Sequence, residues 1–413
     1  MVDFRRILAA ALSVLALIAC GSGDTGSTNT GNSKPFVMGV VLSWSGAFGT
    51  NGPAQVGAFQ TAADHINATG GILGRKMKVV FRDDQSDVNK TVLAVQDLMD
   101  NEHADAIWPE SVSAFITAGL PFVTQHKLIS FDVGSVNDPQ KFPYNFQMGV
   151  VKPQDVAADI AALTALPTMV SGTPQLKKIA IASTNDASGQ LYASSSESQL
   201  KAKGFTVTDK VIFSNNLPDL TVQVKQLQGG SPDAIMVHVF GPDTGTFMKA
   251  IRDVGWKSVI VMGDPGSIPF IDLQTVVPKE VWGQLYFPQY KNASREGDTA
   301  QSSFIDSLLT HGPILSLTSA GLVADALYYL RWAYQKAGTT DADKVKGILE
   351  GVGKLSAKDL PQDLVFFTGN PGYSPTNHSC SEADISGLYA LSKVSPLVNG
   401  SFQRIGVLNT PKP

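Results

Sequence analysis

Apolar and polar positions follow two different periods along the chain, and their order predicts the fold class. Short apolar runs rich in β-branched residues predict strands at residues 36–43, 77–83, 105–109 and 127–131. Amphipathic segments that predict helices fill the intervals, at residues 54–67, 89–101 and 113–125. Strands and helices that alternate at this spacing indicate right-handed βαβ units, in which helices cover both faces of a parallel sheet.

The same alternation starts again after Pro153. Further helices are predicted at 155–165, 190–203, around Leu220 and at 244–254, and further strands at 177–183, 205–213, 233–240 and 258–263. A mostly helical block is predicted at 298–350, followed by a strand-like tail with Pro and Gly turns at 364–407. The expected fold class is therefore α/β, with two doubly wound, Rossmann-like lobes in series.

The start of the chain has the pattern of an export signal. Arg5 and Arg6 precede an uncharged apolar stretch that is too short to span a bilayer as a helix. Its last residues, Leu17–Cys20, resemble the bacterial lipobox, in which cleavage before the cysteine leaves a lipid-modified N-terminus. We expect residues 1–19 to be a lipoprotein signal peptide, and residues 20–35 to be the lipid-modified Cys20 with a flexible tether. The alternative is an ordinary secretory signal with a chance cysteine.

The composition and net charge of the chain restrict the kinds of partner that it can bind. The 413-residue chain is 43% hydrophobic and 16% charged, which suffices for sizeable cores. Its net charge of −4, without a long Lys or Arg cluster after the signal, argues against a nucleic-acid partner. If Cys20 carries lipid, Cys380 has no disulfide partner in this chain, and we expect it to be a small, buried apolar side chain.

Motifs for phosphate, metal or nucleophilic chemistry are weak. The Gly-rich segment 67–76 follows a predicted helix and precedes a strand, so Gly70 and Gly71 indicate a helix C-terminal turn and not a phosphate loop. The six histidines lack the spacing of metal ligands, so we expect no metal and no cofactor. The acidic segment 82–87 can in principle hold a hard cation, but a solvated strand end with Asp87 capping the next helix is the preferred interpretation.

The segment 39–87 resembles the opening of ABC-transporter solute-binding proteins of the branched-chain amino-acid type. The resemblance rests on a first strand that ends in a Ser-Gly turn, a helix that ends "INATGGILG", and a second strand that ends "DDQSD". It continues more loosely through "DPQKFPYNFQ", "GFTVTDKVIF" and "AIRDVGW".

The resemblance implies a type I periplasmic-binding-protein fold, in which two lobes joined by three hinge crossings close on a ligand. The crossings are expected near 148–153, 287–292 and 368–376, where Pro or Gly interrupts the pattern. The N-terminal lobe would then comprise residues 36–148 plus 290–368, and the C-terminal lobe residues 149–289 plus 369–413.

Ligands of open α/β sheets bind beyond the carboxyl ends of the strands, which selects the candidate site residues. In the first lobe these are Trp44, Ser45, Glu110, Ser111, Ser113, Asp132 and Ser135. The resemblance implies that hydroxyls and backbone N–H groups at Ser111, Ser113 and Ser135 hold a ligand carboxylate, a role compatible with helix capping. Trp44 offers a flat surface for an aromatic or amide-bearing ligand, or else packs into its lobe.

The second lobe departs from the pattern of the family. Ser188 stands where the family usually has a tyrosine, and Pro265 stands where it has an acid, with Asp264 one residue earlier. Phe240 keeps an aromatic position without a hydroxyl, and Asn51 occupies a first-lobe position that is often aromatic. Because a buried ammonium without partners costs several kcal/mol, either Asp186 and Asp264 take over the cation or the ligand is not a zwitterion.

The function expected from this sequence is extracytoplasmic solute binding. A lipid-anchored monomer would capture a small polar ligand, such as an amino acid or an amide, and present it to an ABC permease, without an enzymatic step. One alternative is a ligand-sensing receptor domain. Another is a secreted hydrolase with Ser45 or Ser111 as the nucleophile and a histidine as the base.

Overall fold

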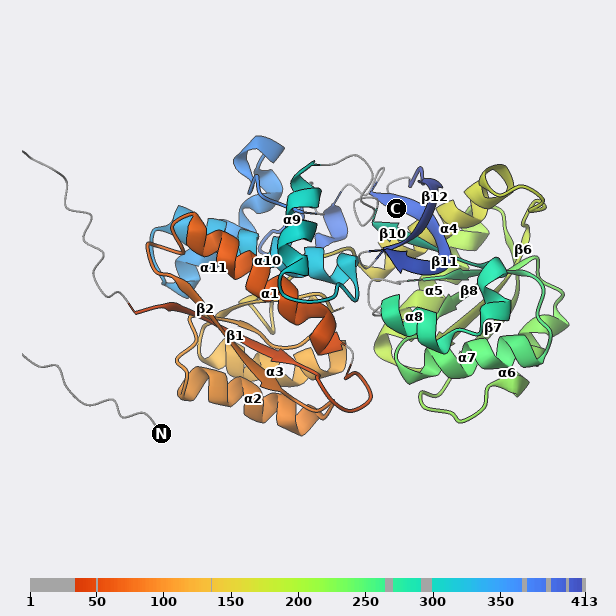
Figure 1. Cartoon of the computed structure of the whole chain (residues 1–413), viewed down its shortest axis with the longest axis horizontal. Coiled ribbons are helices and arrows are strands. Elements are labelled where there is room, and N and C mark those ends of the chain that lie inside the picture. Colours follow the sequence, from red (N-terminus) through yellow and green to blue (C-terminus); the bar gives the residue numbers. More distant parts are fainter. Residues whose placement is uncertain are drawn as a thin grey trace, which may run out of the picture. The chain divides into compact units, whose positions relative to one another are not determined.

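The computed structural model describes residues 34–49, 51–134, 136–263, 270–290, 299–365, 370–383, 388–398 and 401–410. Two separate sheets run through this part of the chain (Figure 1). The first sheet is parallel, with strand order β2-β1-β3-β4-β5. Its strands are β1 (Phe36–Leu42), β2 (Met77–Asp83), β3 (Ala106–Trp108), β4 (Ile129–Asp132) and β5 (Asn145–Gln147).

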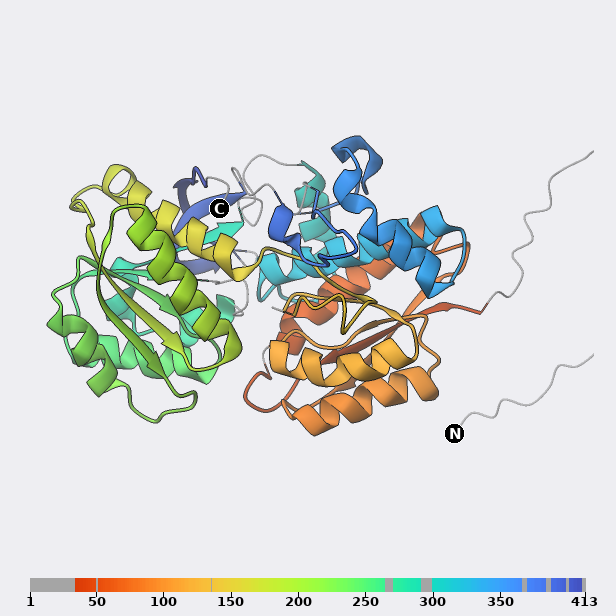
Figure 2. The ribbon, with the colours of Figure 1, turned by 180° about the vertical axis from the view of Figure 1, so that it is seen from behind.

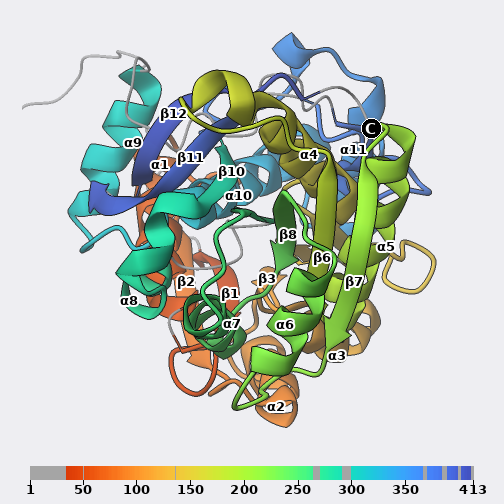
Figure 3. The same ribbon diagram turned by 90° about the vertical axis from the view of Figure 1, so that its right-hand side faces the viewer.

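The second sheet is mixed, with strand order β12-β11-β10-β9-β8-β6-β7. Strands β6 to β10 pair in parallel, whereas β11 and β12 add an antiparallel edge (Figure 3). The strands are β6 (Lys178–Thr184), β7 (Thr206–Phe213), β8 (Ala234–His238), β9 (Val259–Met262), β10 (Leu285–Tyr290), β11 (Tyr389–Val398) and β12 (Ser401–Val407). The predicted strand-like tail is thus confirmed only where β11 and β12 lie.

Each sheet has its own helices, and we use this to define two lobes. The first lobe is the first sheet with α1 (Asn51–Ala68), α2 (Val88–Asp100), α3 (Ser113–Gln125), α9 (Thr299–Leu309), α10 (Leu317–Ala337) and α11 (Ala342–Glu350). The second lobe is the second sheet with α4 (Lys152–Met169), α5 (Ala187–Ala202), α6 (Thr221–Gly229), α7 (Pro242–Asp253) and α8 (Phe270–Val276). Short 3₁₀ segments lie at Lys279–Gln284, Val352–Lys354, Ala357–Asp359 and Cys380–Glu382.

Side-chain alternation in β1 explains why its sheet is covered on both faces. Phe36, Met38 and Val40 enter a cluster with α1 and α10, whereas Val37 and Val41 enter a cluster with α2 and α3. Figures 1 and 2 show these two helix pairs on opposite faces of the first sheet. Helix α10 lies within the helical block predicted at 298–350 and is buried along most of its length.

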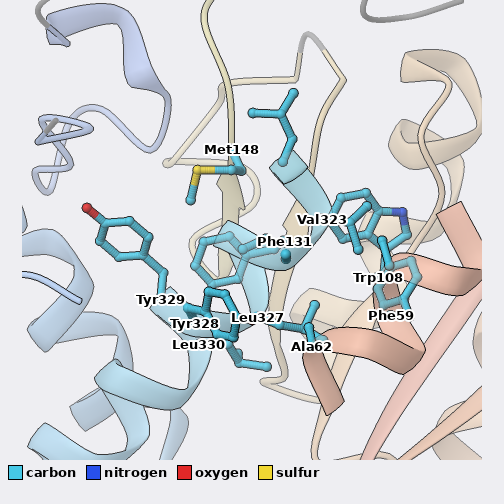
Figure 4. Packing of buried hydrophobic residues seen from close by; sticks show 14 of the residues in the cluster. Phe59, Ala62, Trp108, Phe131, Met148, Val323, Leu327, Tyr328, Tyr329 and Leu330 are labelled. Carbon is cyan, nitrogen blue, oxygen red and sulfur yellow. The ribbon is translucent and has the colours of Figure 1, made fainter. Parts of the chain in front are cut away.

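Aromatic and aliphatic side chains fill the space between the first sheet and α10. Figure 4 shows Phe131 and Trp108 from the strands opposite Val323 and Leu327 of α10. Trp108 is fully buried and meets the Phe59 ring edge-on, with ring centroids 5.3 Å apart. This packing fixes the strand ends that carry the first-lobe candidates.

The chain passes three times between the lobes. The first passage follows β5, and the second follows β10. Before the third, Tyr373, Cys380 and Ala383 still belong to the first-lobe core, and Tyr389 begins β11 of the second sheet. The expected boundary at 368/369 stays a prediction, and the packing of Tyr373 and Cys380 favours a later third crossing.

Three local predictions are confirmed. Gly71 has a φ of 72° and donates its N–H to the Ile66 carbonyl at 2.8 Å, as in a helix C-terminal turn. Asp87 caps α2 by accepting hydrogen bonds from the N–H groups of Asn89 and Lys90. Cys380 is fully buried, and burial raises the pKa of its thiol to about 12. Within the described residues, no helix is long and apolar enough to cross a membrane.

Candidate functional site

The candidate residues of the first lobe lie at the carboxyl ends of its parallel strands. Trp44 and Ser45 follow β1, Glu110 and Ser111 follow β3, and Asp132 ends β4. Because β1, β3 and β4 are adjacent and parallel, these ends meet at one edge of the sheet. The structure therefore brings these candidates together.

Glu110 turns its carboxylate back onto the protein backbone. Its Oε1 accepts the N–H of Ser43 at 3.0 Å, and its Oε2 accepts the N–H groups of Ser111 and of Val112, the latter at 2.6 Å. Its φ of 147° is rarely adopted by a residue other than glycine. Backbone N–H groups that an anionic ligand would need are thus already bound to an internal carboxylate.

A second carboxylate lies beside Glu110. The Ser43 hydroxyl donates to Asp84 at 2.7 Å and lies 3.3 Å from Glu110 Oε1, so one hydroxyl bridges two buried acids. Burial, together with the neighbouring Asp84, raises the pKa of Glu110 to about 7. Glu110 therefore keeps its proton to a higher pH than an exposed glutamate does.

Ser111 belongs to a hydrogen-bond chain that crosses the lobe. Its hydroxyl accepts from the Trp108 indole at 3.2 Å and donates to Gln55 Oε1 at 2.8 Å. Gln55 in turn donates to the Ser319 hydroxyl at 2.9 Å. The chain fixes the Ser111 side chain on α1 and α10, so any ligand contact from this hydroxyl competes with the bond to Gln55.

Asp132 and Ser113 flank the next loop. Asp132 is fully buried, with one oxygen accepting the Gly134 N–H and the other accepting from Asn145 Nδ2, each at 2.7 Å. Burial raises the pKa of Asp132 to about 7. Ser113 begins α3, and its hydroxyl would lie 3.1 Å from a Cβ added at Gly134. Ser113 therefore lies against this loop.

Trp44 packs on its own lobe. Its backbone N–H donates to the Asp83 carboxylate at 2.9 Å. Its ring packs edge-on against the Phe81 ring, with centroids 5.6 Å apart. It also lines a pocket of about 270 Å³ with Pro53, Val56, Gly57, Leu308, His311, Gly312, Pro313, Ile314 and Leu315. The Ser45 hydroxyl donates to Asp83 at 3.0 Å. These contacts favour the packing interpretation of Trp44 over ligand stacking.

In the second lobe, the candidates gather around His238. Asp186 caps α5 by accepting the N–H groups of Ser188 and Gly189, each at 3.0 Å. The Ser188 hydroxyl lies 3.2 Å from Nε2 of His238, which ends β8 and is 2% exposed. The His238 ring stacks on Tyr192 at 4.9 Å. Ser188, which the resemblance places where the family has a tyrosine, thus has His238 as its partner.

The two lobes meet through aromatic rings. Phe48, in the loop after β1, stacks on Phe240, just beyond β8, with centroids 6.1 Å apart and planes 26° apart. Phe48 also meets Phe115 edge-on at 5.8 Å, and Phe240 lies 5.8 Å from His238. This row of rings, Phe115, Phe48, Phe240, His238 and Tyr192, joins the carboxyl edges of both sheets.

Some candidates lie outside the described residues, namely Ser135, Asp264 and the lipidation candidate Cys20. Asn51 begins α1, but its side chain is not among the parts described. The candidates selected from the sequence do not include Phe48, Gln55 or His238. His238 had a usable signal, because it lies at the carboxyl end of a predicted strand, two residues before Phe240.

Comparison with known proteins identifies the family. The family model described as "Periplasmic binding protein" matches residues 35–382. A curated relative, the Leu/Ile/Val-binding protein homolog 8 of Brucella abortus, is 25% identical over 235 residues. That alignment covers 56% of this chain and 58% of the relative.

Solved structures agree on the fold. A leucine-binding protein from Thermotoga maritima has a TM-score of 0.69 at 18% identity, covering 90% of this chain and 98% of that one. An ABC-transporter solute-binding protein from Rhodopseudomonas palustris, in complex with 4-hydroxybenzoate, has a TM-score of 0.71 at 18% identity, covering 92% and 98%. The chain therefore belongs to the periplasmic binding protein family and has the type I fold of its branched-chain amino-acid type.

Proposed function

We propose that this protein is a solute-binding component of an ABC importer that captures a small polar ligand where its two lobes meet. The observation that carries the proposal is the meeting of both carboxyl sheet edges through Phe48 and Phe240. A ligand that contacts both lobes favours their closed arrangement by the difference between its affinities for the closed and open forms. Presentation of the closed form to a permease requires no chemical step.

The proposed ligand is an amino acid, an amide or a related small polar molecule. The related structures include a leucine-binding protein and one bound to 4-hydroxybenzoate, so both aliphatic and aromatic ligands occur with this fold. We propose that the first-lobe serines, Ser111, Ser113 and Ser135, approach the acidic end of the ligand. Asp186 and Asp264 are proposed as partners of a ligand cation, if the ligand carries one.

A ligand panel tests the function. Amino acids, amides, small aromatic acids and short peptides are added to the purified protein, and its thermal unfolding is followed. A true ligand present at 100 times its dissociation constant is expected to add about 2.7 kcal/mol of stability. Ser111→Ala is expected to lower the affinity for the ligand that the panel identifies about tenfold. The substitution removes a hydroxyl that we propose contacts the acidic end of the ligand.

A matched control variant shows whether Ser111 contacts the ligand directly or only supports Gln55. Ser319→Ala removes the far end of the Gln55 chain without touching the proposed site. We expect it to alter ligand affinity less than twofold. Equal losses in both variants would show that Ser111 acts only through Gln55, and a panel without any stabilising compound would contradict the proposed function.

We also propose that Cys20 carries lipid and tethers the protein outside the cytoplasm as a monomer. The basis is the lipobox-like Leu17–Cys20 and the Gly-, Ser- and Thr-rich segment that follows. Cys20→Ser is expected to move the protein from the membrane fraction to the soluble extracytoplasmic fraction, as measured by fractionation and immunoblotting. Cys380→Ser is the control, and membrane retention of Cys20→Ser would refute the anchor.

A further inference from the structure

The row of rings at the lobe contact points to the class of ligand. Phe48 and Phe240 are half-buried and come from opposite lobes, and their planes are 26° from parallel. Two aromatic ring faces that are nearly parallel favour binding of a ligand with a flat, conjugated ring over a ligand with a branched aliphatic chain.

We propose that the ligand carries a flat aromatic ring that inserts between Phe48 and Phe240, with a polar ring substituent held by Ser188 and His238. This inference rests on the proposed function and specifies its ligand class. The centroids of the two rings are 6.1 Å apart. A ring in contact with both faces needs about 7 Å, two contacts of about 3.5 Å, so a small separation of the lobes admits it.

Phe48 is held in place by its surroundings. Its N–H donates to the Ser86 hydroxyl at 3.0 Å, and this hydroxyl donates to the Ser45 carbonyl at 2.7 Å. Phe115 supports the ring edge-on from α3. Because these contacts belong to the first lobe alone, the ring stays in position when the lobes separate.

Phe240 is positioned by the end of β8 and by the glycine that follows. Gly241 has a φ of 58°, and a Cβ added there would lie 3.1 Å from Cε1 of Phe48. Glycine at this position thus permits both the turn into α7 and the approach of Phe48. Phe240 also packs against the core of the second lobe, so the second face of the proposed sandwich belongs to that lobe.

The polar end of the proposed ligand site is the Ser188–His238 pair. His238 lies 5.8 Å from Phe240 and 3.2 Å from the Ser188 hydroxyl, and its stacking on Tyr192 fixes the orientation of its ring. Ser188 is half-buried at the start of α5, where its hydroxyl can form a hydrogen bond with a ring hydroxyl or a similar polar group of the ligand. This arrangement predicts discrimination between a hydroxylated ring and the same ring without the hydroxyl.

Matched probes test the proposal by isothermal titration of the whole protein. 4-Hydroxyphenylacetate, phenylacetate and cyclohexylacetate differ by one hydroxyl and by ring flatness, and leucine represents aliphatic amino acids. We expect both flat probes to bind at least about tenfold more tightly than cyclohexylacetate, and the hydroxylated probe to bind most tightly. Phe48→Leu and Phe240→Leu, which keep apolar volume, are expected to remove the preference for a flat ring.

Controls within the second lobe keep the test specific. Phe205→Leu changes a half-buried phenylalanine that precedes β7, at the opposite end of its strands, and Ser194→Ala removes an exposed hydroxyl of α5. Both are expected to leave the affinities unchanged. Ser188→Ala is expected to abolish the preference for the hydroxylated ring while sparing the preference for flatness.

The outcomes distinguish this inference from the proposed function. If cyclohexylacetate or leucine binds as tightly as the flat probes, or if the Phe48 and Phe240 variants leave affinities within twofold, the aromatic ligand is refuted and solute capture stands. If no member of the wider panel binds at all, both proposals fall.

Discussion

Replacing Glu110 with alanine is expected to lower the free energy of unfolding by at least about 3 kcal/mol. Three backbone N–H groups, those of Ser43, Ser111 and Val112, lose their acceptor in a buried place, and each such loss costs about 1–3 kcal/mol. Urea unfolding of the purified protein measures the difference.

A glycine at the same position is the matched comparison. The φ of 147° at Glu110 suits glycine, so Glu110→Gly loses the same hydrogen bonds but relieves backbone strain. We expect Glu110→Gly to be about 1 kcal/mol more stable than Glu110→Ala. A Glu110→Ala protein within 1 kcal/mol of the wild type would contradict the role assigned to this carboxylate.

The free energy of unfolding is also expected to fall by several kcal/mol as the pH rises from about 4 to about 7. Burial raises the pKa of both Glu110 and Asp132 to about 7 in the folded protein, whereas their ordinary values are 4.5 and 3.8. Between these limits the folded state binds more protons than the unfolded state, so stability is highest at the acidic end and declines with rising pH. Well above pH 7, where both groups are ionised in the folded state as well, they add no further change.

Asp132→Asn is expected to remove about half of this decline, since it removes one of the two titrating groups. Urea midpoints measured from pH 4.5 to pH 7.5 test this, with Asp138→Asn, which changes an exposed carboxyl of the same lobe, as the control. A flat stability profile in the wild type, or an unchanged slope in Asp132→Asn, would show that the buried acids do not titrate in this range.

The sequence predicted best those helices and strands that are long or strongly apolar and keep a regular pattern of apolar and polar residues. Helix α3 and strand β2 begin and end where the pattern places them. Strand β5 was missed because three residues carry almost no period, and β10 because Pro288 interrupts it. Pairing of β10 with β9 ends at Tyr286, two residues before Pro288, so the proline lies where that ladder has stopped.

The candidate site was located by the strand-end rule, but the partners of its side chains were not predictable. Nothing in the residues around Glu110 says that its carboxylate folds back onto the next two amides, because that depends on its unusual φ. The contact of Phe48 with Phe240 likewise depends on tertiary structure, since nearly two hundred residues separate them in the sequence and no local pattern links them.

The antiparallel edge of the second sheet has a consequence for biogenesis. Strand β10 pairs with β11, yet α9, α10 and α11 of the first lobe lie between them in the sequence. During synthesis, β10 therefore lacks this neighbour until residues 389–398 emerge. The second lobe therefore completes its sheet only after most of the polypeptide has been synthesised, so this lobe finishes folding late.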